Sequence, residues 1–199
     1  FPMLVVADAD MNSHIARLSG NKWMVFYGEA GATVKARLFD GTVLNSEEVC
    51  STGNLATATS ICTAHDNSDE VWMTYTKDAG GGDYLIMFCH RSAAGVWDAE
   101  QDVVGQSVYS SSVGWIALGY DAKLYVVWFN YPETDHIYYR PITKAGVMGD
   151  TVDAYTDTDG VASINRANLT PVARMVTADP AVGVLDLSLI HISEPTRPS

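Results

Sequence analysis

The stretch that decides the fold is Leu124–Asp153, LYVVWFNYPETDHIYYRPITKAGVMGDTVD. It opens with a β-branched and aromatic run at Leu124–Phe129, which is typical of a strand. A polar turn follows, then a second strand at Ile137–Arg140, a turn that contains glycine, and a short strand near Thr151–Asp153. Another apolar strand, Trp115–Leu118, comes just before it. The stretch and this preceding strand therefore predict four short strands joined by tight turns.

The same order of strands and turns occurs twice earlier in the chain. Expected strands are His14–Leu18, Lys22–Tyr27, Val34–Phe39 and Val43–Cys50, and then Ser60–Ala64, Val71–Thr76, Tyr84–His90 and Trp97–Val104. A further unit begins at Pro171–Val176. The matching first-strand positions are taken as Ile15, Ile61, Ile116 and Val172, which are 46 to 56 residues apart, and each precedes a small residue. Repeats of this length with four strands each predict the blades of a β-propeller.

The fold class predicted is all-β: a partial β-propeller with about three complete four-stranded antiparallel blades and a truncated fourth. We expect one domain over residues 1–186, with blades at about 13–52, 59–105, 113–156 and 170–186. A single blade cannot bury both of its faces, so neighbouring blades must stack on one another. The second strands contain Trp23, Trp72 and Trp128, which we expect to pack between blades.

Composition narrows the class of partner. The net charge is −12 and the isoelectric point is about 4.6. An acidic surface repels nucleic-acid phosphates and anionic lipids, so neither is expected as a partner, nor is membrane insertion. Ca²⁺ or a neutral ligand fits this charge better. The three cysteines match neither a disulfide framework nor a zinc motif, and Cys62 and Cys89 are expected to be small buried apolar residues.

The end of the chain has a different character. The run Leu187–Arg197, LSLIHISEPTR, resembles the in-frame translation of a sequencing-library adapter. We therefore expect residues 187–199 to be a non-native tail and the natural, environmental sequence to continue differently beyond Asp186. On that expectation, further blades of the same chain are missing, and a signal region is not visible in this sequence.

Two segments resemble known repeat families. RSAAGVW at Arg91–Trp97 is similar to a degenerate Asp-box of sialidase-like propellers with bacterial neuraminidase repeats, although the Asp and Thr of that box are missing. The expected third strands contain Arg37, Arg91 and Arg140, which we align with one another. Val34–Val49 also resembles tandem repeats of large secreted bacterial surface proteins. The resemblance implies a propeller. It would imply hydrolysis only with an arginine triad, a Tyr–Glu nucleophile pair and an acid Asp, which these motifs do not locate.

Propellers bind ligands at one end of the central channel, where the loops enter each first strand or join the second and third strands. Carboxylates and aromatic rings on such loops are typical of glycan sites. The candidate ligand residues are His14, Asp83, Trp115, Tyr131 and Asp135. Asp157 and Asp159, in the run DTDG, are candidate Ca²⁺ ligands. The alternative is that all of these are ordinary polar turn residues.

These observations favour a ligand-binding module, expected to recognise carbohydrate, in a secreted, cell-surface or phage protein. Whether the chain is an enzyme stays open: the alternative is part of a sialidase-like glycoside hydrolase or a polysaccharide lyase. A second alternative is a purely structural repeat array. Motifs for nucleotide phosphates, zinc peptidases and serine hydrolases are absent from the sequence.

Overall fold

The structure is a computed structural model that describes residues 13–28, 33–51, 53–54, 61–105, 114–129 and 136–156. All regular structure in these residues is β-strand. The strands are β1 (His14–Arg17), β2 (Trp23–Gly28), β3 (Val34–Phe39), β4 (Leu44–Val49), β5 (Cys62–His65), β6 (Val71–Gly80), β7 (Asp83–Arg91), β8 (Gln101–Asp102), β9 (Trp115–Leu118), β10 (Lys123–Phe129), β11 (His136–Thr143) and β12 (Val152–Thr156).

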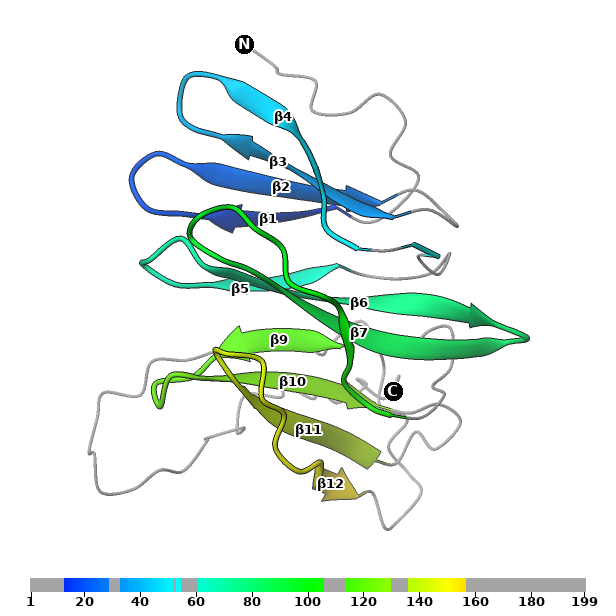
Figure 1. Ribbon diagram of the computed structural model, residues 1–199. Coiled ribbons are helices and arrows are strands. Elements are labelled where there is room, and N and C mark those ends of the chain that lie inside the picture. Colours follow the sequence, from blue (N-terminus) through cyan, green and yellow to red (C-terminus); the bar gives the residue numbers. More distant parts are fainter. Residues whose placement is uncertain are drawn as a thin grey trace, which may run out of the picture.

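The strands form three four-stranded antiparallel sheets in chain order. Sheet 1 contains β1–β4, sheet 2 contains β5–β8 and sheet 3 contains β9–β12. The sheets follow one another as a stack, and their first strands β1, β5 and β9 are neighbours (Figure 1). The prediction of three complete blades is confirmed, and the sheets do not close into a ring. The truncated fourth blade and the 187–199 tail lie outside the described residues.

The registers show which positions of the three sheets are equivalent. His14, Cys62 and Trp115 each begin a first strand, and each lies opposite the residue twelve positions later. Ile15 is therefore equivalent to Ile116, as predicted, but the equivalent in sheet 2 is Thr63 and not Ile61. The small residue repeated in the first strands is alanine, at Ala16, Ala64 and Ala117.

Two apolar clusters hold the stack together. The first fills the space between sheets 1 and 2 and includes Met24, Phe26, Met73 and Tyr75. The second lies between sheets 2 and 3 and includes Trp72, Phe88, Ile116, Val126 and Trp128. The prediction that tryptophans pack between blades is thus confirmed for Trp72 and Trp128, which are 0% and 2% exposed.

Trp23 differs from the other two tryptophans. It is half-buried on the face of sheet 1 that points away from sheet 2, with the Arg17 guanidinium 5.6 Å from its ring centroid. The prediction that Trp23 packs between blades is therefore not tested by the described sheets, because Trp23 does not face sheet 2. The reason is its register: Trp23 is an odd-numbered residue of β2, whereas Met24 and Phe26 face the cluster with sheet 2.

Close approach of sheets 2 and 3 requires a glycine before β9. A Cβ at Gly114 would lie 2.5 Å from Cγ2 of Ile86, and the Gly114 carbonyl accepts a 2.5 Å hydrogen bond from the Thr74 hydroxyl. Any side chain at this position would therefore push β9 away from sheet 2.

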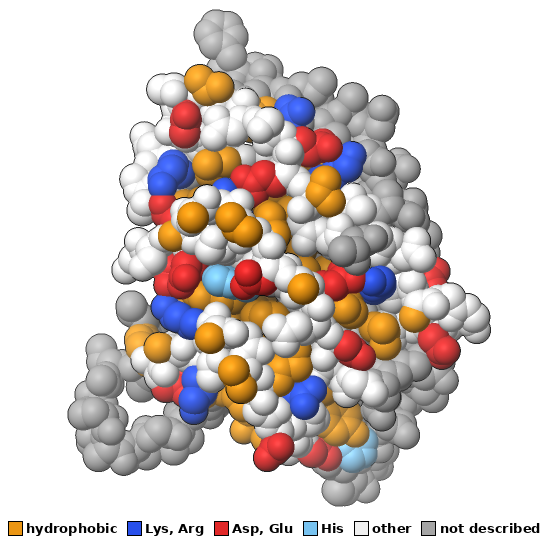
Figure 2. Space-filling view, viewed as in Figure 1, with side chains coloured by type: hydrophobic (Ala, Val, Ile, Leu, Met, Phe, Trp, Pro, Cys, Tyr) orange, Lys and Arg blue, Asp and Glu red, His pale blue; other side chains and the backbone are white. Residues whose placement is uncertain are grey.

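The visible surface carries charges of both signs. On the face shown in Figure 2, Asp and Glu side chains are scattered among Lys and Arg side chains and do not form one patch. The described residues include no helix that is long and apolar enough to cross a membrane.

Candidate functional site

The predicted ligand residues that the structure describes, His14, Asp83 and Trp115, belong to one end of the sheets. This end, which we call the entry end, is where β1, β5 and β9 begin and where β6 turns into β7, on the right in Figure 1. The opposite end, which we call the turn end, contains the β1–β2, β5–β6 and β9–β10 turns. The predicted residues that the structure describes, His14, Asp83 and Trp115, can therefore be placed relative to these two ends.

His14 lies at the entry end of the hub formed by the first strands. Its Nδ1 is 2.8 Å from the hydroxyl of Thr63, which joins β1 to β5. Burial lowers the pKa of His14 below its ordinary 6.5, and the nearby His65 lowers it further. His14 is therefore neutral at pH 7 and offers a ring nitrogen for hydrogen bonding.

Trp115 begins β9 at the position equivalent to His14 and is half-buried. Because β5 contacts both β1 and β9, His14 and Trp115 lie at the same end of the hub, on strands that β5 separates. Asp83 is exposed at the tip of the long β6–β7 hairpin, which extends beyond the starts of the hub strands (Figure 1). His14 and Trp115 therefore share the entry end of the hub, and Asp83 lies at the hairpin tip.

Four predicted residues lie outside the described residues: Tyr131, Asp135, Asp157 and Asp159. The Ca²⁺ site and two of the five predicted ligand residues, Tyr131 and Asp135, therefore remain predictions. Within the described ranges, no group of three or more His, Cys, Asp or Glu side chains is arranged to hold a metal ion.

An aromatic stack at the entry end of sheet 3 was not predicted as a unit. The rings of Trp128 and Tyr138 stack with centroids 5.9 Å apart, and the His136 ring lies 5.6 Å from Tyr138 at an interplanar angle of 8°. Nδ1 of His136 is 2.7 Å from an Asp153 carboxylate oxygen. The stack therefore combines flat apolar faces with a carboxylate-held imidazole, and His136 directly follows the segment that contains Tyr131 and Asp135.

Two tyrosines each donate a hydrogen bond to a carboxylate further along the same sheet. The Tyr27 hydroxyl is 2.5 Å from Glu47, which also pairs with Lys35 at 3.2 Å. Tyr75 makes the equivalent contact with Glu100, which pairs with Lys77. Tyr27 and Tyr75 occupy matching positions of their second strands, but the lysines do not: Lys35 is in β3 and Lys77 is in β6.

The tyrosines of both Tyr–Glu pairs are buried. Tyr27 and Tyr75 are 1% and 0% exposed. Burial, reinforced by Glu47, raises the pKa of Tyr27 to about 12, and burial followed by Glu100 raises the pKa of Tyr75 as well. Both phenols therefore stay protonated at neutral pH and are closed to a substrate, so neither pair has the properties of an accessible nucleophile.

The arginines of the third strands are engaged in separate places. Arg91 donates two hydrogen bonds of 2.8 Å to Glu48 in sheet 1, and Glu48 also accepts one of 2.9 Å from the Trp97 indole. Arg140 donates to the Gly149 carbonyl at 2.7 Å and to the Val103 carbonyl in sheet 2. The predicted alignment is correct for Arg37 and Arg140 but not for Arg91.

The misalignment of Arg91 has a register explanation. Arg37 and Arg140 lie opposite Val25 and Val126, which are equivalent, whereas Arg91 lies opposite Val71, two residues earlier in its strand. Arg91 is therefore next to the tight turn that the Asp-box-like segment forms. Gly95 has a φ of +85° there, and a Cβ would lie 3.0 Å from the Arg91 guanidinium.

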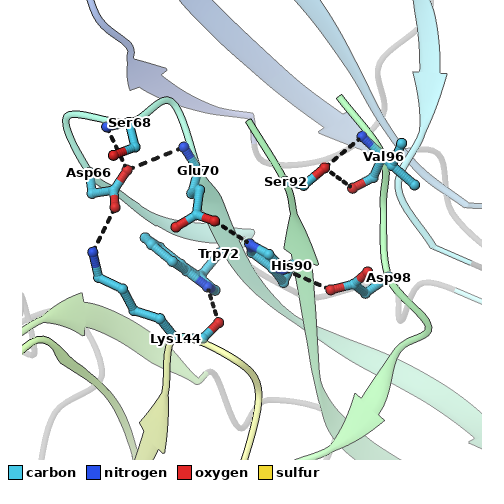
Figure 3. Close-up of polar contacts among 9 residues, drawn as sticks. All are labelled: Asp66, Ser68, Glu70, Trp72, His90, Ser92, Val96, Asp98 and Lys144. Carbon is cyan, nitrogen blue, oxygen red and sulfur yellow. Dashed lines mark hydrogen bonds and ion pairs between the residues drawn. The ribbon is translucent and has the colours of Figure 1, made fainter. Parts of the chain in front are cut away.

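A polar cluster surrounds Trp72 at the turn end (Figure 3). Lys144 of sheet 3 binds the Asp66 carboxylate at 2.6 Å, and its carbonyl accepts a 3.2 Å hydrogen bond from the Trp72 indole. His90 stacks on the Trp72 ring with centroids 5.5 Å apart and has Asp98 2.7 Å from its Nδ1. These contacts join the edges of sheets 2 and 3.

The Asp66–Asp69 turn contacts both neighbouring sheets. Asp69 accepts hydrogen bonds from the Ser19 amide at 2.6 Å and from Lys22, both in sheet 1. Burial acts to raise the pKa of Asp66, but the Lys144 ammonium and backbone amides hold that pKa below the ordinary 3.8. Asp66 and Asp69 therefore bind side chains and backbone of the neighbouring sheets, and we interpret the turn end as a structural contact between sheets.

Comparisons with known proteins do not establish a family for this chain. No protein-family model matches the chain, and no curated protein is significantly similar to it. Among solved structures, a mutant of NanB sialidase from Streptococcus pneumoniae is similar, with a TM-score of 0.45 and 12% identity over 69% of this chain. A neuraminidase-like protein from A/bat/Guatemala/164/2009 has a TM-score of 0.46 and 11% identity over 71% of this chain. The matches span 21% and 37% of those chains.

Proposed function

We propose that this chain is the carbohydrate-binding part of an extracellular β-propeller and that the ligand is held at the entry end. The observation that carries the proposal is the stack of His136 on Tyr138, with His136 held by Asp153. Sugars bind where a flat apolar surface lies beside a few fixed hydrogen-bonding groups. Asp153 and His136 have 41% and 26% of their side chains exposed, so both are accessible to a ligand.

The hub contributes the second part of the proposed site. Trp115 offers an aromatic face, and the neutral His14 imidazole with the Thr63 hydroxyl offers hydrogen bonds. Asp135 directly precedes His136 in the chain and Tyr131 lies in the same segment, while Asp83 lies at the β6–β7 tip. In this proposal, they contribute contacts at the rim.

The contacts of the third-strand arginines and the burial of the two Tyr–Glu tyrosines favour binding over hydrolysis. Arg91 and Arg140 bond across to neighbouring sheets, and Tyr27 and Tyr75 are buried with their carboxylates. A sialidase-like or lyase activity needs such groups to converge on a substrate, so it is the alternative function. Ca²⁺ binding by Asp157 and Asp159 and location outside the cell, on its surface or on a phage particle belong to the same proposal.

A glycan array with the 199-residue chain tests the proposal. We expect selective binding of at least one glycan and a loss of affinity of at least about tenfold in His136→Ala and Trp115→Ala. Tyr120→Ala is the matched control, since Tyr120 is 69% exposed at the turn end and should leave binding unchanged. Equal binding by all three variants would reject this site. Turnover of a fluorogenic sialoside by the unmodified chain would favour the enzyme alternative.

A further inference from the structure

A pocket lies between the first turns of sheets 1 and 2 at the turn end. Its volume is about 340 Å³, and its described walls are residues 17–20 of sheet 1 and residues 65–67 of sheet 2. The β1–β2 and β5–β6 turns that contribute to these walls lie one above the other, on the left in Figure 1. Clefts that bind small molecules have volumes of about 300–1,000 Å³. Both walls belong to sheets that are packed on each other, so the pocket does not depend on any further sheet.

Hydrogen bonds hold the two walls of this pocket in place. Asp69 accepts bonds of 2.6 and 2.9 Å from the amide and hydroxyl of Ser19, and it also binds Lys22. In sheet 2, Asp66 accepts bonds of 2.8 and 3.2 Å from backbone amides of its own turn (Figure 3). Leu18, the apolar residue of the sheet 1 wall, is 5% exposed. The pocket is therefore preorganised, and a ligand need not order either turn.

The carboxylate that lines the pocket is already paired. Asp66 is the acidic residue among the described lining residues, and its carboxylate is 2.6 Å from the Lys144 ammonium of sheet 3. The Asp66 side chain is only 10% exposed. A cation entering the pocket would have to displace Lys144, so the pocket is not suited to a positively charged ligand.

Three exposed side chains of the pocket are available to a ligand. They are Arg17, His65 and Asn67, and none of them makes a hydrogen bond or ion pair with another described residue. The Arg17 guanidinium lies 5.6 Å from the centroid of the Trp23 ring, a contact that does not use its N–H groups. All three side chains can donate hydrogen bonds, and an ionised carboxylate only accepts them. Arginine in particular matches the two oxygens of a carboxylate.

We propose that this pocket binds a small organic carboxylate. Arg17 supplies the positive charge, His65 and Asn67 donate hydrogen bonds from the other wall, and Leu18 offers an apolar contact. The net charge of −12 does not attract anions over a long distance, so the affinity comes from these local contacts. The pocket is at the opposite end of the sheets from the proposed carbohydrate site, and this inference does not rest on that proposal.

Two-dimensional NMR of the ¹⁵N-labelled 199-residue chain at about pH 7 tests the inference, with D-glucuronate and D-glucose as probes. The two sugars differ only in the carboxylate, so a carboxylate site distinguishes them. We expect glucuronate to shift the amide signals of Gly20 and Asn67 saturably, with a Kd on the order of 1 mM. Glucose should bind at least about tenfold more weakly. Inorganic phosphate is the third probe, because its oxygens also accept hydrogen bonds from such donors.

Variants locate the binding in the pocket. Arg17→Met and Asn67→Ala should each weaken glucuronate binding at least about fivefold. Asn45→Ala is the matched control, since it removes an amide from an exposed position of β4 and should leave the Kd unchanged. Each variant is first checked for an unchanged melting temperature, and the comparison of probes decides the question with the unmodified chain even if a variant misfolds.

Four results would overturn the inference. They are the absence of a saturable shift at Gly20 and Asn67, equal binding of glucose, tighter binding of phosphate than of glucuronate, and unchanged affinity in both folded variants. Glucuronate shifts confined to the entry end, at His136 and Tyr138, would also overturn it while supporting the proposed carbohydrate site. The two proposals can therefore fail separately.

Discussion

Removing the Glu48 carboxylate should destabilise the contact between sheets 1 and 2 far more than removing an exposed carboxylate does. Both oxygens of Glu48 accept hydrogen bonds of 2.8 Å from Arg91, and one accepts a third, of 2.9 Å, from Trp97. The side chains of Arg91 and Glu48 are 7% and 24% exposed. Glu48→Ala therefore leaves a nearly buried guanidinium without its partner.

The magnitude follows from breaking a largely buried ion pair. Loss of one partner of a buried pair costs about 3–5 kcal/mol, and partial exposure of Glu48 places this case at about 3 kcal/mol. Glu48→Gln keeps the shape and one acceptor, so we expect about half that loss. Asp150→Ala is the control, because it removes the same charge from an exposed position and should change stability by less than about 0.5 kcal/mol.

Urea unfolding at 25 °C, followed by tryptophan fluorescence, measures the free energy of unfolding. A double-mutant cycle with Arg91→Met isolates the pair, and the double variant should be more stable than the sum of the single losses predicts by at least about 1.5 kcal/mol. If Glu48→Ala unfolds within about 0.5 kcal/mol of the Asp150→Ala control, the contact does not hold sheets 1 and 2 together, and the reasoning fails.

Three further outcomes are expected. The folded pKa of His14 lies below 6.5, so the free energy of unfolding should decline as the pH falls from 6.5 toward that lower pKa. His14→Gln should reduce this decline. Urea midpoints of both proteins at about pH 7.5 and 5.5 would show the difference. Gly114→Ala should destabilise by about 1–3 kcal/mol, since its Cβ would meet Ile86 at 2.5 Å; an unchanged melting temperature would contradict the packing. Burial raises the pKa of Cys62 and Cys89 to about 12, so neither thiol should react with a disulfide reagent at about pH 8 until urea is added, and rapid native labelling would disagree.

Local patterns predicted most strands well. Val34–Phe39 and Trp115–Leu118 were predicted with the observed bounds, because alternating or apolar runs between Gly-containing or polar turns specify strands locally. The expected strand Trp97–Val104 was wrong in extent, since β8 is only Gln101–Asp102. Trp97 keeps one isolated bridge to Arg91 and directs its indole to Glu48, 49 residues away, and no local signal encodes that contact.

The candidate site was less predictable. His14 and Trp115 were found as members of one end because both begin first strands. The stack of His136 on Tyr138 and the burial of the Tyr–Glu pairs depend on cross-strand register and on which face meets a neighbouring sheet. A shift of two residues was enough to misalign Arg91 with Arg37, although the strands themselves were correctly located.

By itself, the sequence determined where strands and turns lie and that they repeat, because alternation and turn chemistry act over a few residues. Tertiary structure alone decided the partners: Arg91 with Glu48, Lys144 with Asp66, and the opposite environments of Ile15 and Ile116. Those pairings join residues 43 and 78 positions apart. They exist only after whole sheets have stacked, and stacking depends on the summed shape of both faces rather than on any short run of residues.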